Sequence, residues 1–133
     1  MTGVVLDTHA AIWYLAGSPK LSERAATCIG EAVREGAPVC ISAISLLEVV
    51  YLVEKGKMQE VALDRLLDAL ASPDADLVAV PFDAQKAVTA RRLPRDDIPD
   101  MPDRIIAATA LDLGFPLVTR DCKIRAAEIE TVW

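Results

Sequence analysis

Short runs of β-branched and other apolar residues alternate along this chain with longer segments that have the period of an amphipathic helix. The predicted strands are residues 3–7, 39–41, 77–80 and 116–119, with an edge strand expected at 130–133. The predicted helices are residues 8–15, 21–34, 44–54, 59–70, 83–93, 104–113 and 122–127. Strands that alternate with helices form parallel sheets with helices on both faces. We therefore expect an α/β fold with three layers, α/β/α, around a parallel sheet of four to five strands.

The length and composition favour one globular domain, residues 1–133. Hydrophobic residues make up 53% and charged residues 26% of the chain, which is typical of a protein that buries a core. No apolar run reaches the roughly 18 to 20 residues that a membrane span requires, and the N-terminus lacks the basic leader of a signal peptide. We expect a cytoplasmic protein with no membrane partner.

The cysteines and the charged residues argue against several kinds of site and partner. Three cysteines, without CxxC spacing, argue against a disulfide framework and against a zinc site. The formal net charge of −6 argues mildly against a nucleic-acid partner. Residues 91–125, however, contain seven Lys and Arg against six Asp, so this third of the chain is nearly neutral. It becomes positive if cations neutralise some of its aspartates.

Acidic residues stand at or just after the ends of two predicted strands. Asp7 ends the first strand, and Asp121 lies two residues after the fourth. Ligands of open parallel sheets bind at the carboxyl ends of the strands, where both acids are expected. Asp100 and Asp103 lie one turn apart, just before the predicted helix 104–113. Taken singly, each of these aspartates could instead be a helix cap or a first-turn acid.

The segment ISAISLLEVVYLV, residues 41–53, contains a single acid, Glu48, within an apolar helix pattern. An ionised carboxylate buried without a partner is costly, unless its pKa shifts and it becomes neutral. Capping cannot explain an acid in the middle of a helix, although a buried ion pair or a narrow exposed stripe could. Ser45 lies one turn before Glu48, on the same face.

A divalent cation would explain why acids recur in four separate segments. Mg²⁺ and Mn²⁺ prefer oxygen ligands, and clustered carboxylates are unstable unless a cation lies among them. The candidate catalytic and metal-binding acids are Asp7, Glu48, Asp103 and Asp121. Such a site lowers the pKa of a bound water and stabilises charge on a phosphoryl group. Basic residues near the acids would attract a polyanion, and the candidates are Arg104, Arg120 and Lys123.

The order of these acids and the sequence around them resemble the PIN domain. The stretches that carry the resemblance are VVLDTHAAIWYLAG, ISAISLLEVVYLVEKGK and DMPDRIIAATALDLGFPLVTRD. The resemblance is closer to the VapC toxins of bacterial type II toxin–antitoxin systems. It implies strand order 3-2-1-4-5 and an endoribonuclease that depends on Mg²⁺ or Mn²⁺ and inhibits translation or growth. It also implies an RNA substrate (tRNA, rRNA or mRNA), a small cognate antitoxin, a homodimer and a larger toxin–antitoxin complex.

The resemblance also implies roles for single residues. The four acids match metal-binding positions, and Asp100 matches a further acid that many relatives have. Thr8 and Thr119 match hydroxyl residues beside the acids, and Ser45 matches a polar position before Glu48. These three are candidate substrate-binding residues, together with Arg104, Arg120 and Lys123. Relatives often have a basic, aromatic stretch such as HRDPFDR before the third acid, whereas this chain has IPDMPDR, so substrate contacts there need not match.

Two aromatic residues, His9 and Trp13, follow Asp7 in the first predicted helix. His9 could lie near the acids, but we expect it to cap or support the first helical turn. Trp13 is expected to lie in the core or at an interface. A receiver-type signalling domain is also α/β and binds magnesium, but it would need an acidic pair after its first strand, where only Asp7 is present. A non-catalytic PIN-like binding module remains an alternative, although it would not need all four acids.

Overall fold

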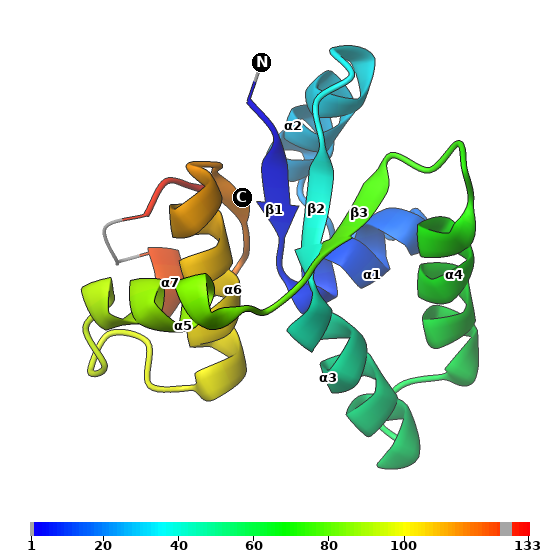
Figure 1. The fold of residues 1–133 in the computed structure, drawn as a ribbon. Helices are drawn as coiled ribbons and strands as arrows, with labels where there is room; N and C mark the ends of the chain where they lie inside the picture. Colours follow the sequence, from blue (N-terminus) through cyan, green and yellow to red (C-terminus); the bar gives the residue numbers. More distant parts are fainter. Residues whose placement is uncertain (1, 126–128) are drawn as a thin grey trace.

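Five parallel strands form the centre of the molecule, as the computed structural model shows for residues 2–125 and 129–133 (Figure 1). The strands are β1 (Val4–Leu6), β2 (Val39–Ser42), β3 (Leu77–Val80), β4 (Leu117–Val118) and β5 (Thr131–Val132). Their order across the sheet is β3-β2-β1-β4-β5, and each pair of neighbours is parallel. The expected α/β class and the strand order 3-2-1-4-5 are confirmed.

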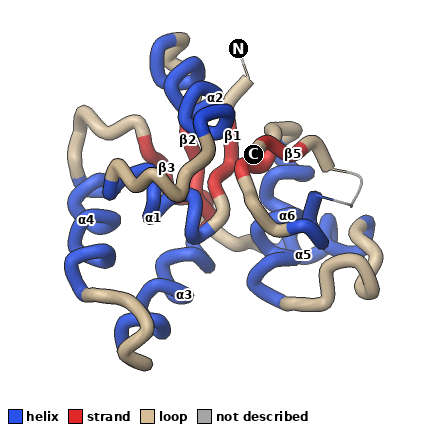
Figure 2. Tube along the Cα trace, turned by 180° about the vertical axis from the view of Figure 1, so that it is seen from behind, coloured by secondary structure: helices blue, strands red, loops and turns tan. Residues whose placement is uncertain are grey.

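Helices cover both faces of the sheet, as Figures 1 and 2 show from opposite sides. They are α1 (Thr8–Ala16), α2 (Glu23–Arg34), α3 (Ala43–Glu54), α4 (Glu60–Ala71), α5 (Ala84–Thr89), the 3₁₀ helix η1 (Ala90–Arg92), α6 (Met101–Leu113) and α7 (Cys122–Arg125). Helices α1 to α4 supply buried side chains to one core, and α6 and α7 to the other. Among the described residues, no helix is both long and apolar enough to cross a lipid bilayer.

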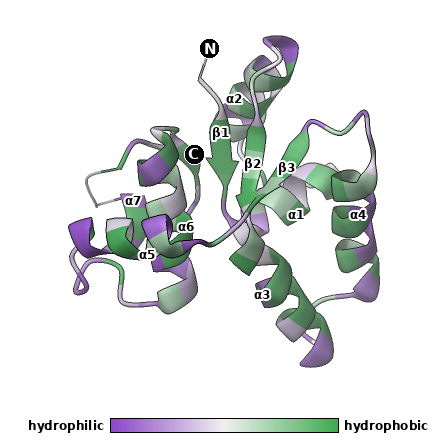
Figure 3. Cartoon of the chain, in the orientation of Figure 1, coloured by the Kyte–Doolittle hydropathy of each residue, from purple (hydrophilic) through white to green (hydrophobic). Residues whose placement is uncertain are grey.

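The buried side chains of the central strands alternate between these two cores. In β1, Val4 and Leu6 join the core with α1 to α4, whereas Val5 joins the core with α6 and α7. In β2, Ile41 lies on the first side and Cys40 on the second. Because helices cover both faces, these strands read as continuous apolar runs, and Figure 3 shows them in the colour of hydrophobic residues.

The helices around the segment 93–103 differ from the prediction. The helix expected at 83–93 is α5 followed by η1, and the chain turns to an extended conformation at Leu93. Pro94 explains this end, since the residue before a proline disfavours the helical region. Helix α6 begins at Met101, not at 104, because Pro102 fits a first turn, where no backbone N–H is needed. The helix expected at 122–127 is described only as far as Arg125, and residues 126 and 127 lie outside the described range.

Leu66 and Leu67 are neighbours on α4 in opposite environments, since Leu66 is 1% exposed and Leu67 is 49% exposed. We predict that Leu66→Ala lowers the free energy of unfolding by about 2–5 kcal/mol, because it removes buried methyl groups and leaves a cavity. Leu67→Ala is the matched control and should lower it by less than about 1 kcal/mol. Urea denaturation of both variants measures the difference. Equal effects would contradict the packing of α4 described above.

Candidate active site

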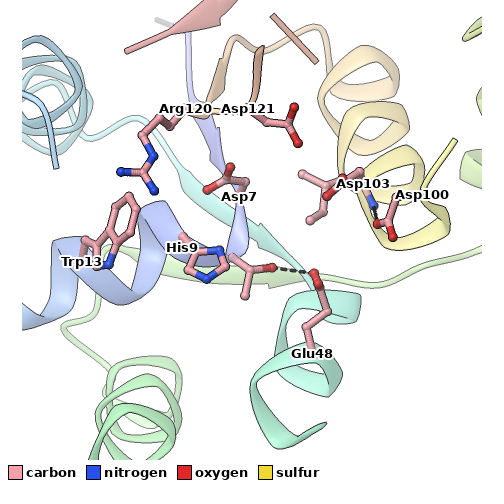
Figure 4. A pocket seen from close by; sticks show the side chains of 10 residues that line it. Asp7, His9, Trp13, Glu48, Asp100, Asp103, Arg120 and Asp121 are labelled. Carbon is pink, nitrogen blue, oxygen red and sulfur yellow. Dashed lines mark hydrogen bonds between the residues drawn. The ribbon is translucent and has the colours of Figure 1, made fainter. Parts of the chain in front are cut away.

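One pocket brings together residues from the ends of β1 and β4 and from helices α1, α3 and α6 (Figure 4). Most of its polar lining is acidic. The lining residues are Asp7, Thr8, His9, Trp13, Glu48, Asp100, Asp103, Ile106, Arg120 and Asp121. All five candidate acids therefore surround one cavity at the carboxyl end of the parallel sheet, where ligands of such sheets bind.

Asp7 both caps a helix and lines the pocket. Its Oδ1 accepts a hydrogen bond from the backbone N–H of Ala10 (2.8 Å), which caps α1. Its Oδ2 accepts a hydrogen bond from the Thr119 hydroxyl (2.6 Å), which follows the neighbouring strand β4. Burial raises the pKa of Asp7 above its usual value, although both hydrogen bonds act to lower it. The capping alternative and the site alternative are thus compatible at this residue.

Glu48 projects from α3 into the same pocket. Its Oε1 accepts a hydrogen bond from the Thr8 hydroxyl (2.6 Å), which also lies 2.9 Å from Ser45 Oγ. Among the described residues Glu48 forms no ion pair, since the salt bridges there join Lys86 to Asp83 and Asp112. Burial raises the pKa of Glu48, the Thr8 hydrogen bond lowers it, and the charge of Asp100 raises it further. The acid within the apolar helix therefore faces the other acids.

The remaining acids stand at helix beginnings on the other side of the pocket. Asp100 caps α6 by accepting a hydrogen bond from the backbone N–H of Asp103 (3.1 Å). Asp121 Oδ1 accepts a hydrogen bond from the backbone N–H of Lys123 (2.8 Å). Asp103 lies in the first turn of α6, one turn after the capping residue Asp100.

The electrostatics of the pocket are strongest at Asp103. Burial raises its pKa to about 7, and the charges of four neighbouring acids act in the same direction. Those acids are Asp100, Asp121, Glu48 and Asp7. Carboxylates that raise each other's pKa in this way lack a compensating positive charge. A cation in the pocket would reverse the shift.

The oxygen donors of the pocket suit a hard divalent cation, but their present positions do not form a complete coordination shell. The carboxylate and hydroxyl oxygens are the ligands that Mg²⁺ and Mn²⁺ prefer, and no cysteine lines the pocket. In the described part of the chain, however, no three His, Cys, Asp or Glu side chains converge closely enough to hold an ion as they stand. The acids surround a common space, and side-chain rotation would have to complete a coordination shell. Mg²⁺ tolerates this, since it keeps several waters and takes few protein ligands.

The structure separates the candidate substrate-binding residues. Arg120 lines the pocket, whereas Lys123 is exposed outside its lining. Arg104 points to the backbone, where its guanidinium donates to the carbonyl oxygens of Ala90 (2.8 Å) and Leu93 (3.1 Å). The interpretation of Arg104 as a substrate ligand is therefore not supported, because this side chain holds the end of η1 against α6.

The hydroxyl residues also take a different role from the expected one. Thr119 and Ser45 are fully buried, so they are shielded from any substrate in this conformation. Thr119 orients Asp7, and Ser45 lies beside Thr8, which orients Glu48. These residues support the acids and do not form the surface of the pocket. Thr8 is buried as well but does contribute to the lining.

Two lining residues were not among the site residues that the sequence predicted. Trp13, expected in the core or at an interface, and His9, expected to support a helical turn, both line the pocket. Their spacing of four residues places them on one face of α1. Since Asp7 caps the same helix, that face could have been assigned to the site from the sequence.

Comparison with known proteins places this geometry in a family. Residues 4–130 match the PIN domain family. The chain is 33% identical over 126 residues to Ribonuclease VapC22 of Mycobacterium tuberculosis, covering 95% of this chain and 92% of that protein.

Solved structures share the fold. The structure of VapBC2 from Rickettsia felis, bound to a DNA fragment from its promoter, matches with a TM-score of 0.71 and 20% identity, covering 97% of this chain and 96% of that chain. DNA-bound VapBC from Salmonella typhimurium matches with a TM-score of 0.70 and 22% identity, covering 98% and 97%. At these identities the structures support the fold alone, whereas the sequence matches establish the family. The chain belongs to the PIN domain family, and its relatives there are of the VapC type.

Proposed function

We propose that this protein is an endoribonuclease that hydrolyses RNA phosphodiester bonds with the help of Mg²⁺ or Mn²⁺. The observation that carries the proposal is the set of five carboxylates around one pocket. Burial, together with the charges of the other four acids, raises the pKa of Asp103 to about 7. A site that needs a cation and lies at the carboxyl end of a parallel sheet suits metal-assisted hydrolysis. Ribonuclease VapC22, the relative with 33% identity, supports RNA as the substrate.

In the proposed reaction the acids hold the cation, and neighbouring residues position the acids and the RNA. The acids that would hold the cation are Asp7, Glu48, Asp103 and Asp121, with Asp100 adding negative charge beside them. When bound, the cation would acidify a water and neutralise charge that develops on the phosphoryl group. Hydrogen bonds from Thr119 and Thr8 hold Asp7 and Glu48 in position, so these two ligands are oriented before the cation arrives. Arg120, at the rim of the acids, would bind a phosphate of the RNA.

A protein partner is the second part of the proposal. The structural neighbours include VapBC complexes, and in this chain α3 and α4 expose large apolar side chains to solvent. Tyr51 on α3 is 52% exposed and Leu67 on α4 is 49% exposed. We infer that a small antitoxin covers this apolar surface and neutralises a toxin that inhibits translation or growth. We place the chain in the cytoplasm as a single domain that forms a homodimer and a larger complex with its antitoxin.

The two alternative functions are less consistent with the structure. A receiver-type domain has the strand order 2-1-3-4-5, whereas this sheet has the order 3-2-1-4-5. A non-catalytic binding module would not require five carboxylates held against their mutual repulsion in one pocket. The endoribonuclease remains the function that accounts for this cost.

We predict that the purified protein, freed of any bound partner, cleaves a structured RNA in Mn²⁺ or Mg²⁺ and not in EDTA. Asp7→Asn should reduce the rate at least about 100-fold, because it removes a charged ligand from the site. Asparagine remains a good helix cap, so α1 should keep its N-terminus. Gel analysis of end-labelled RNA measures the rates.

The matched control is Asp83→Asn, which also alters a capping aspartate. Asp83 accepts a hydrogen bond from the backbone N–H of Lys86 (3.1 Å) at the start of α5, and it does not line the pocket. The Asp83→Asn protein should cleave RNA at the rate of the unaltered protein. Cleavage that survives EDTA, or that Asp7→Asn leaves intact, would contradict the proposed site.

A second prediction concerns stability without metal. The pKa of Asp103 rises from 3.8 in the unfolded chain to about 7 in the fold, so its contribution to stability is present below pH 4 and is lost as the pH rises through 7. Asp103→Asn removes this dependence. In EDTA, the variant should therefore become more stable than the unaltered protein as the pH rises from 5 to 8. The gain at pH 8 should be about 1–2 kcal/mol, a figure reduced because water screens this half-buried group.

Urea denaturation at the two pH values, with and without Mg²⁺, measures these stabilities. Mg²⁺ should stabilise the unaltered protein at pH 8 more than it stabilises Asp103→Asn, because the ion compensates the charge that the variant lacks. Asp68→Asn, at an exposed position of α4 outside the pocket lining, is the control. If Asp103→Asn behaved as this control does at both pH values, the carboxylates would not be coupled as described.

A further inference from the structure

The pocket has two chemically different sides. Asp100 and Asp103 lie on one side, and Trp13, His9 and Arg120 lie on the other, with Asp7 and Glu48 between them (Figure 4). The ring centroids of His9 and Trp13 are 5.5 Å apart. The guanidinium carbon of Arg120 lies 4.6 Å from the centroid of the Trp13 ring. An aromatic surface therefore adjoins the acids within a single cavity.

Arg120 is placed on this aromatic surface and not on the acids. It lies two residues after β4 and directly before Asp121, yet among the described residues it forms no salt bridge. Its recorded partner is the indole ring of Trp13. A cation–π contact at a solvent-exposed site is weak, so Arg120 can leave the ring at low cost.

Trp13 lines the pocket and also contacts a second indole ring. The Trp133 ring, at the C-terminus beside β5, lies 5.8 Å from it at an interplanar angle of 59°. Trp133 is not part of the pocket lining. A half-buried indole that a second indole supports is held in one orientation, as a stacking surface requires.

We propose that Trp13 is the base-binding residue of this site. It stacks on the base of a nucleotide that flanks the scissile phosphate, while Arg120 leaves the ring and binds a neighbouring phosphate. The inference rests on the proposed function and adds to it the part of the RNA that the pocket recognises. The substrate class is single-stranded or looped RNA, since a paired base does not offer its face to a side chain.

The balance of contacts favours this exchange. Stacking of a base on an aromatic side chain is stronger than an exposed cation–π contact. Arg120 also gains charge-assisted hydrogen bonds to a phosphate, for which its planar guanidinium is suited. Stacking on a ring tolerates every base, so Trp13 supplies affinity and register without reading the sequence.

The test measures binding of a 12-nucleotide single-stranded RNA of mixed sequence, with Asp7→Asn present in every protein so that the RNA stays intact. Anisotropy of the labelled RNA gives the dissociation constants. Adding Trp13→Leu should weaken binding about tenfold, because the stacked base is lost. Adding Trp13→Phe should retain most of the affinity, because phenylalanine can still stack. Phe82→Ala, which removes an exposed aromatic side chain outside the pocket, is the control and should leave binding unchanged.

A spectroscopic measurement separates stacking from a structural role. The chain has two tryptophans, so Trp133→Phe leaves Trp13 as the single indole. Its fluorescence should be quenched by the single-stranded RNA and much less by the same RNA in a duplex. Equal binding by Trp13→Leu and its parent, or no quenching by bound RNA, would overturn the role of Trp13 while leaving the nuclease intact. If the Asp7→Asn protein bound no RNA and the unaltered protein showed no metal-dependent cleavage, both the proposed function and the role of Trp13 would be overturned.

Discussion

Hydrogen bonds at helix beginnings hold mutually repelling carboxylates in one place, and the rest of the site depends on this constraint. A parallel sheet whose strands lead into helices brings several helix N-termini to one edge, where their partial positive charge favours acids. Asp7 and Asp100 each satisfy a backbone N–H group of α1 or α6. The same carboxylates face a shared pocket. Capping and site formation are therefore one arrangement, and the fold itself provides part of the free energy that keeps the acids together.

Contacts across neighbouring elements then set the orientation of each acid. Thr119 connects β4 to Asp7 at the end of β1, and Thr8 connects α1 to Glu48 on α3. Both threonines are buried, so the sheet and its helices support these acids directly. Charge is also divided within the pocket, with Arg120 and Trp13 opposite the acids of α6. The overall charge of −6 gives little indication of this local division.

The sequence predicted most of the fold, because β-branched runs and helical periods are local properties. The runs 3–7 and 39–41 became the central strands β1 and β2, although the strand order itself came from a family resemblance. The sequence did not show which way long side chains turn. Arg104 follows an acid of the site, yet it binds the carbonyl oxygens of Ala90 and Leu93. Trp13 has the pattern of a core residue but lines the pocket, where its ring also contacts Trp133 from the far end of the chain. The direction of such a side chain depends on contacts between segments that are distant in the sequence, and a local hydrophobic period does not reveal these contacts.

The raised pKa of Asp103 has a consequence for the stability of the fold at neutral pH. Without a cation in the pocket, crowded carboxylates weaken the fold at neutral pH, so a larger fraction of molecules opens at any moment. Cellular proteases cleave opened chains and spare closed ones. A cation bound in the pocket would relieve the crowding and shift molecules to the closed state. The stability of the fold at neutral pH therefore depends on what occupies the pocket.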